Sequence, residues 1–504
     1  MRTFTVSDYL LLHLDKAPGQ PRNQRIYQLL RQLILDRVLP PDTRLPSSRD
    51  LALQLGLSRN TVLYGYEQLL AEGYLETRGS GGTYVTDTVP MLDGAPPASA
   101  RRKPAAANAH SALSRRGRKL VAHAGAAQQQ WGAFVPGVPD VTQFPHKTWN
   151  ALQSRIWRNP PVASLTYGHG GGHQPLRAAL ANYLKVSRSV DCTPEQIVIT
   201  GGIHQSIDLC MRLLSDPGDA AWVEDPCYWG ARNMLAAAGV EIRPVELDQE
   251  GLRPKPGQLA RPPRFIFVTP SHQYPLGTVM SLSRRRMLLE YAQRHGCWII
   301  EDDYDSEFRY GGRPLASLQG MDRGERVLYM GTFSKTMFPG LRLGYLVLPE
   351  ALAPAFVTGM EEVYRSGHAP LQATMAAFIE RGHFNAHIRR MRLLYGSRLE
   401  ILQRAIATEF APDQVHAAGA DAGLHLTLYL PPECDDRAVA QTAQQMGIAV
   451  RPLSGYYHQQ SRSQSGLVLG YACVESARIA PAFAQLARAI RTHRTAFLQA
   501  NHST

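Results

Sequence analysis

The sequence predicts a multidomain protein with a small α+β unit near its N-terminus, a linker, and a much larger α/β domain. Its 504 residues are too many for one ordinary domain. Residues 88–130 are rich in Ala, Pro, Gly and Ser, and they separate two segments with regular hydrophobic patterns. In the second segment, short β-branched runs alternate with helix-like stretches, which indicates a mainly parallel sheet covered on both faces. We therefore expect folded domains at 20–87 and 131–495, joined by a flexible basic linker.

The charge and the cysteine usage restrict the function classes. A formal net charge of +12 favours nucleic acid or another polyanion as a partner, although an ordinary basic enzyme fits it equally well. The six cysteines form no CxxC pair and are too scattered for a disulfide framework, so we expect reduced thiols and no metal site. The N-terminal segment is too polar for a signal peptide, and no run approaches the ~18 apolar residues of a membrane span. We expect a cytoplasmic protein without membrane contact.

Residues 20–87 have the pattern of a winged helix-turn-helix. Apolar residues at helical spacing predict a first helix that includes Ile26–Ile34. Ser47 or Ser48 can N-cap a second helix, and Gly56 suits the tight turn that follows it. Ser58 can N-cap a third helix, whose apolar positions are Val62, Tyr66, Leu69 and Leu70.

The first turn of the third helix is left polar by this pattern. Arg59, Asn60 and Thr61 lie where a recognition helix meets base edges in the DNA major groove. A hydroxyl and free N–H groups at a helix start also suit phosphate oxygens. Gly73–Thr86 predicts a hairpin with a glycine-rich tip, the wing, which places Arg78 near the DNA backbone or minor groove. The alternative is a helix-turn-helix that is used only for packing.

The motif LPSSRDLALQLGLSRNTV, followed by LLAEGYLETR and GTYV, resembles the GntR-type winged helix over about sixty-five residues. The resemblance implies that Arg49, Ser58, Arg59 and Thr61 are the main DNA contacts. The sequence departs from the family at Asp42, where the family usually has glycine, and this puts the geometry of one turn in question.

The strands and helices of the larger domain are expected from short apolar runs. The helix-like stretch Leu282–Arg294 separates two of these runs. The expected strands are Ile197–Thr200, Ala221–Glu224, Phe265–Thr269, Trp298–Glu301 and Val327–Met330.

Several residues at the ends of these strands suit a phosphate-bearing cofactor that forms a Schiff base. Lys335 stands in GTFSKTMFPGLRLGY, with hydroxyl residues before it and Arg342 after it, which can anchor a phosphate. In IIEDDYDSEF, a buried carboxylate can pair with a protonated pyridine nitrogen, and a tyrosine two residues on can bond a phenolic oxygen. In VITGGIHQSIDL, the N–H groups after a glycine turn can hold a phosphate. Tyr228 follows another strand and could stack on a ring.

Residues 131–490 resemble fold-type I aminotransferases of class I and II, which have a C-terminal α+β small subdomain. With the winged helix they resemble the MocR/GabR regulators, notably in TPSHQYPLGTVMS and IIEDDYDSEFRYGGRPL. The resemblance implies that pyridoxal 5'-phosphate forms a Schiff base with Lys335, while Asp302 pairs with the pyridine nitrogen and Tyr304 with the phenolic oxygen. Tyr167 would contact the phosphate from the partner subunit, whereas the roles of His272 and Gln273 stay open. The other implied cofactor contacts are Gly202, Ile203, His204, Tyr228, Thr332, Ser334 and Arg342.

Two departures from ordinary aminotransferases affect the expected ligand. The late strand GLVLGYACV, residues 466–474, lacks the arginine that usually holds a substrate carboxylate. The residues after Tyr228, Trp229 and Gly230, also provide none. Arg451 is the remaining candidate for a carboxylate of the effector, although a structural ion pair would explain it equally well.

These observations favour a DNA-binding transcriptional regulator. The expected protein is a homodimer that binds repeated half-sites and responds to an amine or amino acid, or to pyridoxal phosphate itself, at Lys335. One alternative is an active aminotransferase with an accessory DNA-binding domain. Another is a DNA-binding protein in which the aminotransferase fold only dimerises the chain.

Overall fold

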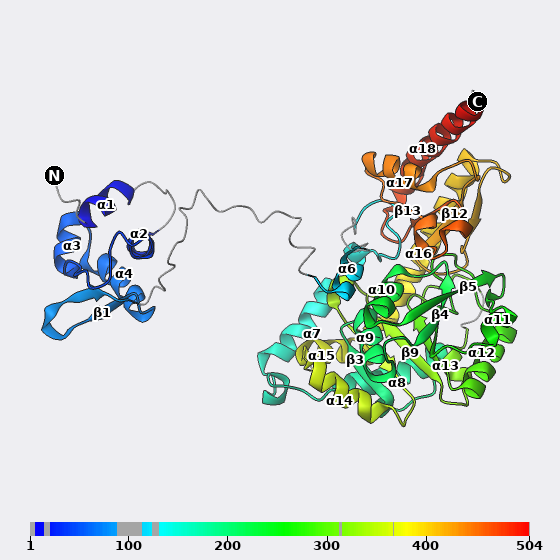
Figure 1. Cartoon of the computed structure of the whole chain (residues 1–504), viewed down its shortest axis with the longest axis horizontal. Helices are drawn as coiled ribbons and strands as arrows, with labels where there is room; N and C mark the ends of the chain where they lie inside the picture. The colour runs from blue at the N-terminus through cyan, green and yellow to red at the C-terminus, as the bar shows by residue number, and fades with distance from the viewer. Residues whose placement is uncertain are drawn as a thin grey trace. The chain divides into compact units, whose positions relative to one another are not determined.

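The computed structural model describes residues 6–14, 21–87, 113–122, 131–311, 315–365 and 367–502. The chain divides into two compact units, Met1–Asn108 and Ala109–Thr504 (Figure 1). Among the described residues, no helix combines the length and the apolar character needed to cross a membrane.

The N-terminal unit is a bundle of helices with a small two-stranded wing, as the sequence predicts. Ser47 accepts a hydrogen bond from the Asp50 N–H and caps one helix, and Ser58 caps the next through the Thr61 N–H at 3.3 Å. Gly56 ends the first of these helices in the left-handed region, with φ 65°. The elements are α1 (Val6–His13), α2 (Arg22–Leu35), α3 (Ser48–Leu55), α4 (Arg59–Ala71), β1 (Leu75–Thr77) and β2 (Thr83–Val85).

Asp42 keeps the backbone conformation that a glycine would adopt at this turn. Its φ is 63°, in the left-handed region that Asp tolerates better than most side chains. Its carboxylate contacts Arg78 of the wing, with Oδ1 2.5 Å from Nη2. The departure from glycine therefore leaves the turn intact and ties it to the wing.

The C-terminal unit is built on an eight-stranded mixed sheet of order β3-β10-β9-β8-β7-β4-β5-β6. The strands β5, β4, β7, β8 and β9 run parallel, whereas β10 is antiparallel to both of its neighbours and β6 is antiparallel to β5. The expectation of a mainly parallel sheet is met, with these two strands reversed. The strands are β3 (Ile197–Thr200), β4 (Ala220–Asp225), β5 (Glu241–Asp248), β6 (Gly251–Leu252), β7 (Phe265–Val268), β8 (Trp298–Asp303), β9 (Val327–Thr332) and β10 (Gly344–Val347).

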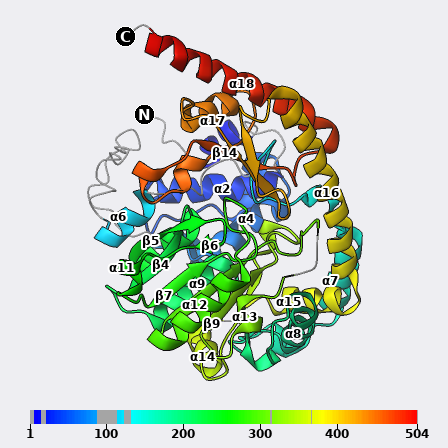
Figure 2. The same ribbon diagram turned by 90° about the vertical axis from the view of Figure 1, so that its right-hand side faces the viewer.

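Helices cover both faces of this sheet (Figures 1 and 2). In β7, Phe265 and Phe267 pack with α9, α10 and α14, while Ile266 and Val268 pack with α12 on the opposite face. This alternation follows from the two-residue period of a strand. The helices are α7 (His146–Arg158), α8 (Gln174–Arg188), α9 (Ile203–Leu214), α10 (Trp229–Ala238), α11 (Pro256–Leu259), α12 (Leu282–His295), α13 (Leu318–Met321), α14 (Ala353–Tyr364) and α15 (Ala369–Glu380).

The end of the chain forms a smaller α+β subdomain with an antiparallel sheet of order β11-β12-β14-β13. The long helices α16 and α18 pack against each other beside this sheet (Figure 2). The elements are α16 (His383–Glu409), β11 (His416–Ala418), β12 (His425–Tyr429), α17 (Asp436–Gln445), β13 (Arg451–Pro452), β14 (Gly466–Gly470) and α18 (Ser476–His502).

The described part of the segment that was expected to be a flexible linker is helical. Of residues 88–130, 88–112 and 123–130 lie outside the described residues. The described part includes α6 (Arg115–Ala122), which lies beside α10 of the same unit. A helix at this place was not predicted, because the Ala-, Pro-, Gly- and Ser-rich composition of residues 88–130 indicated a linker.

Candidate cofactor and effector site

Most of the predicted cofactor residues line one cavity of about 360 Å³ in the C-terminal unit. They come from the carboxyl ends of β8 and β9 and from the starts of α9 and α10, where ligands of open α/β sheets commonly bind. Gly202 immediately precedes α9 at the edge of the cavity. The predicted residues that line the cavity are Ile203, His204, Tyr228, Asp302, Tyr304, Thr332, Ser334, Lys335, Arg342 and Arg451.

One end of the cavity has the chemistry of an anion site. The helix α9 begins after Gly202, whose φ of 114° favours glycine, so its first N–H groups are free of intrahelical partners. A Cβ at Gly202 would lie 3.8 Å from the Arg342 guanidinium, which places this cation beside the helix start. Thr332 and Ser334 line the same cavity. A helix N-terminus with an arginine and hydroxyl groups suits a phosphate.

Lys335 lies inside the cavity and donates a hydrogen bond from Nζ to the Gly137 carbonyl at 2.7 Å. Burial lowers the pKa of this amine, while the negative charges of Asp305 and Asp302 act in the opposite direction. A lowered pKa increases the share of neutral amine, which is the form that attacks a carbonyl carbon.

Asp302 has an unmet hydrogen-bonding capacity that fits a cationic ring nitrogen. Burial, and then the charge of Asp303, raises the pKa of Asp302 to about 8, while Lys335 opposes this shift. Its Oδ1 is buried and has no hydrogen-bond partner among the described residues. A protonated pyridine nitrogen placed here would satisfy this oxygen and favour the charged carboxylate.

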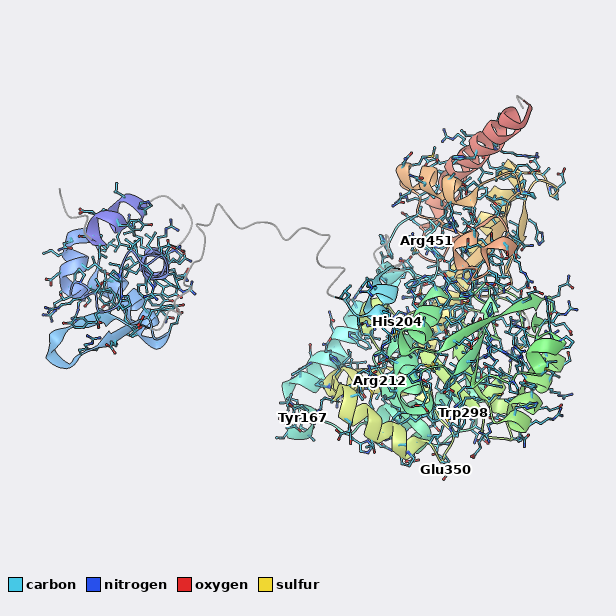
Figure 3. The ribbon with its side chains drawn as sticks, in the orientation of Figure 1. Tyr167, His204, Arg212, Trp298, Glu350 and Arg451 are labelled. Atoms are coloured by element: carbon cyan, nitrogen blue, oxygen red, sulfur yellow. The ribbon has the colours of Figure 1, made fainter. Side chains whose placement is uncertain are left out.

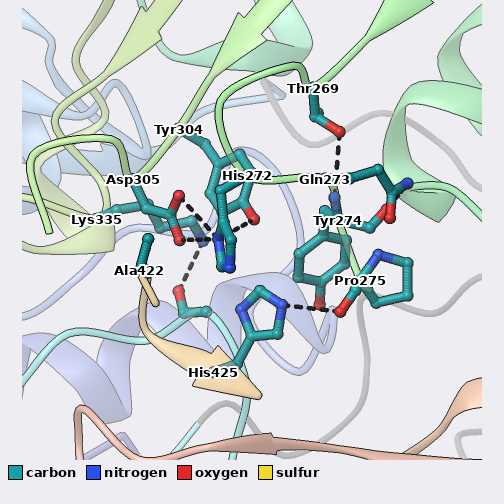
Figure 4. Close-up of polar contacts among 12 residues, drawn as sticks. Thr269, His272, Gln273, Tyr274, Pro275, Tyr304, Asp305, Lys335, Ala422 and His425 are labelled. Atoms are coloured by element: carbon teal, nitrogen blue, oxygen red, sulfur yellow. Dashed lines mark hydrogen bonds and ion pairs between the residues drawn. The ribbon is translucent and has the colours of Figure 1, made fainter. Parts of the chain in front are cut away.

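Tyr304 belongs to a buried polar network behind the cavity (Figure 4). Its hydroxyl lies 3.1 Å from His272 Nδ1, which is also 3.1 Å from Asp305 Oδ2. Gln273, whose role was open, donates from its amide to Glu224 and to the Pro226 and Tyr274 carbonyls, so it holds loops together. The motif DYD at the end of β8 could have identified Asp305 as a site residue. It could not have shown that Asp305 contacts His272.

Part of the cavity wall is aromatic. Tyr228 shares a 3.0 Å hydrogen bond with His204, and the hydroxyls of Tyr274 and Tyr456 are 3.0 Å apart. Trp229, Tyr274 and Tyr456 also line the cavity but were not predicted as site residues. Tyr274 and Tyr456 are 182 positions apart in the chain, so no local motif could have joined them.

Arg451 lies on the strand next to the one that lacks the expected arginine. In the small sheet Arg451 is paired with Val468, which belongs to the late strand GLVLG. Directly opposed residues on neighbouring antiparallel strands present their side chains on the same face. Arg451 therefore brings a guanidinium to this cavity from the adjacent strand.

Tyr167 lies apart from the cavity in the single chain. Figure 3 shows its label well away from those of His204 and Arg451. Its side chain is 83% exposed, and the guanidinium of Arg365 lies 5.7 Å from the ring centroid. Within one chain Tyr167 thus does not join the other predicted cofactor contacts.

The predicted DNA contacts lie at the start of α3, at the start of α4 and on the wing. Arg49, Ser58, Arg59 and Asn60 are exposed, and Thr61 is half-buried, with its hydroxyl 2.7 Å from the Ser58 hydroxyl. The remaining predicted contact lies on the wing and forms ion pairs within the same unit. This is Arg78, which contacts Asp42 and Glu76 and stacks on Tyr84.

Comparison with known proteins finds a separate family match in each of the two units. Residues 22–85 match the family of bacterial regulatory proteins, gntR family, and residues 148–490 match aminotransferase class I and II. The chain is 40% identical over 470 residues to a probable rhizopine catabolism regulatory protein, MocR, of Rhizobium meliloti, covering 92% of this chain and 93% of that protein. It is 30% identical to the HTH-type transcriptional regulator TauR of Rhodobacter capsulatus, covering 94% and 98%.

A solved structure supports the assignment of the larger unit. The multiple substrate aminotransferase of Thermococcus profundus superposes with a TM-score of 0.68 at 25% identity, covering 77% of this chain and 99% of that enzyme. Together with the match to aminotransferase class I and II, this indicates pyridoxal 5'-phosphate as the cofactor of the C-terminal unit.

Proposed function

Because the chain belongs to the MocR-type transcriptional regulators, which join a gntR-family DNA-binding domain to an aminotransferase class I and II domain, we propose that it senses an amino compound at Lys335. Ligand binding there changes the affinity of the winged helix for DNA. The observation that carries the proposal is the single cavity that holds Lys335, Asp302, the anion site and Arg451. As a regulator of DNA it acts in the cytoplasm.

The residues of the cavity have complementary tasks toward the cofactor. Pyridoxal phosphate supplies an aldehyde that amines attack and a ring that accepts electrons. The start of α9, Arg342 and the hydroxyls of Thr332 and Ser334 would hold its phosphate. Asp302 would hold the ring nitrogen, Tyr304 the phenolic oxygen, and Tyr228 the face of the ring. The Lys335 amine would hold the aldehyde carbon covalently until the amine of an effector takes its place.

Arg451 and the aromatic wall would select the effector. A half-buried guanidinium favours a carboxylate or another oxyanion, and the tyrosine hydroxyls of the wall supply further polar partners. A ligand shifts the conformational equilibrium only if it binds the two states with different affinity. We therefore place the effector between Lys335, which meets its amine, and Arg451, which meets its acid group.

The function is tested by following the visible absorption band of the bound cofactor while candidate amino acids are added. For a sensor, the band shifts and then stays, and operator affinity changes at the same ligand concentration. For Arg451→Gln we expect a loss of about 1.5–3 kcal/mol in the affinity for acidic effectors, because a charge-assisted hydrogen bond is removed. An acidic effector that binds the variant and the wild type equally would contradict the role of Arg451.

The same experiment tests the second candidate, an active aminotransferase. The presence of Lys335, Asp302 and Tyr304 in one cavity favours it. Its signature is a visible band that bleaches while a keto acid is released, followed by recovery when a keto acid acceptor is added. Steady turnover would establish a dual role.

We also propose that the protein is a homodimer, with Tyr167 reaching the cofactor site of the other chain. Several exposed apolar side chains precede Tyr167 in the sequence, which is unusual for a surface that faces only water. Three of them are Trp157, Val162 and Leu165, which are 51%, 77% and 57% exposed. A dimer would place two winged helices on repeated half-sites.

For DNA binding we expect Arg59→Ala to lose about 1–3 kcal/mol of operator affinity, since Arg59 is exposed in the first turn of α4.

Operator affinity of the wild type should fall steeply with salt concentration, because counterions are released from phosphates. Fluorescence anisotropy titrations measure both effects and should give two chains per operator. Arg212→Ala, an exposed arginine in the C-terminal unit, serves as the control with unchanged affinity. Equal losses in both variants, or binding of a single chain, would contradict the proposal.

A further inference from the structure

Two histidines and an aspartate form a buried cluster behind the cofactor cavity. His272 and Asp305 lie in the large sheet domain, and His425 is the first residue of β12 in the small subdomain (Figure 4). One donor atom from each of the three residues lies within 4.8 Å of the other two. All three side chains are buried, with His272 2% and His425 0% exposed. Among the described residues, no other group of His, Cys, Asp and Glu has this arrangement.

Each histidine uses one ring nitrogen and leaves the other without a partner. His425 Nε2 lies 3.1 Å from the Pro275 carbonyl, which can only accept a hydrogen bond, so Nε2 carries the proton. In the neutral ring, Nδ1 then has a lone pair, and it meets no partner among the described residues. His272 Nδ1 faces Asp305, and its buried Nε2 is likewise without a partner. One unsatisfied buried nitrogen alone is not evidence of a ligand, since His387 also has one. Two histidines with such nitrogens in one cluster with a carboxylate favour a ligand that they share.

We propose that His272, His425 and Asp305 bind one first-row divalent transition-metal ion. His425, whose second nitrogen donates to a backbone carbonyl, has the pattern that is typical of metal-ligating histidines. Both oxygens of Asp305 lie within 3.3 Å of His272 Nδ1, so one ion can be held between this nitrogen and the carboxylate. Two imidazoles and a carboxylate suit Zn²⁺, Co²⁺ or Ni²⁺, whereas Mg²⁺ and Ca²⁺ prefer ligand sets made of oxygen alone. No local motif predicts this site, because its ligands stand in three separate segments of the chain.

The packing around the cluster holds its ligands in place. A Cβ at Gly423 would collide with the His272 ring and with Asp305 Oδ2, so the backbone at Gly423 is packed directly against both side chains. Tyr304, whose hydroxyl is 3.1 Å from His272, lines the cofactor cavity. An ion bound by His272 would therefore lie one side chain away from the cofactor.

The test measures metal content in the full-length protein. The untagged chain is purified from cells grown with added Co²⁺, and its metal is quantified by mass spectrometry, with electron paramagnetic resonance as a second readout. We expect about one Co²⁺ per chain with a nitrogen-ligated high-spin signal. His425→Gln keeps an N–H donor for the Pro275 carbonyl but loses the imidazole. In this variant we expect metal binding to weaken by about 10- to 100-fold or more.

His387→Gln is a matched control, because His387 is also buried, contacts a backbone carbonyl through Nε2 at 3.1 Å, and has an unpartnered Nδ1. It lies outside the cluster, so this variant should keep its metal. Asp305→Asn should show an intermediate loss while its amide oxygen still accepts from His272. A wild-type protein free of metal, or equal metal content in His425→Gln and His387→Gln, would overturn the proposal. Circular dichroism confirms that each variant is folded.

Discussion

Lys335→Ala is expected to remove both the visible absorption band of the bound cofactor and the response of operator affinity to effectors. Among the described residues that line the cavity, Lys335 is the only lysine, and it lies there with Asp302 and the anion site. Without its amine, the phosphate contacts and Asp302 can still hold the cofactor, but nothing holds the aldehyde carbon. The coupling between effector and DNA, typically about 1–3 kcal/mol, should then fall to zero. Anisotropy titrations with and without effector measure this loss.

The matched control is Lys185→Ala, which removes an exposed lysine from α8 of the same domain. It should keep the visible band and the full response. Operator affinity of Lys335→Ala in the absence of effector should stay near that of the free wild type. If Lys335→Ala still responds to the effector, the sensing site lies elsewhere. If the operator affinity of both the wild type and Lys335→Ala is unchanged by every ligand tested and by pyridoxal phosphate, the aminotransferase fold acts only as a dimerisation scaffold.

The parts of the fold that depend on local patterns were predictable. The run Ile197–Thr200 is β3 to the residue, and Leu282–Arg294 is α12 short of one residue, because apolar periodicity and capping are local properties. The reversal of β10 was not predictable in the same way. The direction of a strand depends on how the chain returns to the sheet, and the segment between Thr332 and Gly344 contains no long crossover helix.

In the candidate site, too, the residues in local motifs were predictable and the contacts between distant segments were not. Lys335, Asp302 and Tyr304 stand in motifs around single strand ends, so the sequence identified them. The pairing of Tyr274 with Tyr456, and of His272 with His425, depends on the small subdomain closing over the sheet, which no local spacing records. Likewise, the sequence flagged Asp42 as a departure, but only the structure shows that Arg78 of the wing compensates for it.

A buried ion pair supports the strand end that carries Asp302. Arg188 is the last residue of α8, and its Nε lies 2.6 Å from Asp303 Oδ2. Both side chains are at most 4% exposed. Its other nitrogens donate to the Leu315 carbonyl and to Ser271 Oγ. Tyr329 donates to the same Asp303 oxygen at 2.6 Å. Asp303 immediately follows Asp302 in β8, so this network fixes the backbone that presents the ring-nitrogen partner.

Arg188→Met is therefore expected to destabilise the C-terminal unit by about 3–5 kcal/mol, because it leaves the Asp303 carboxylate buried without its cation. Urea denaturation followed by tryptophan fluorescence measures the change. Arg212→Ala, which breaks the ion pair of an exposed arginine with the half-buried Asp208, should cost less than about 1 kcal/mol.

The double variant Arg188→Met with Asp303→Asn tests the cause directly. It removes the stranded charge, so it should be more stable than Arg188→Met alone, although Asp303→Asn by itself destabilises the wild type. Additive losses would instead show that Arg188 acts through its contacts with Leu315 and Ser271. If the charge is the cause, Arg188→Met should also weaken cofactor binding. An unpaired Asp303 carboxylate beside Asp302 makes it harder for Asp302 to hold the negative charge that pairs with a protonated ring nitrogen.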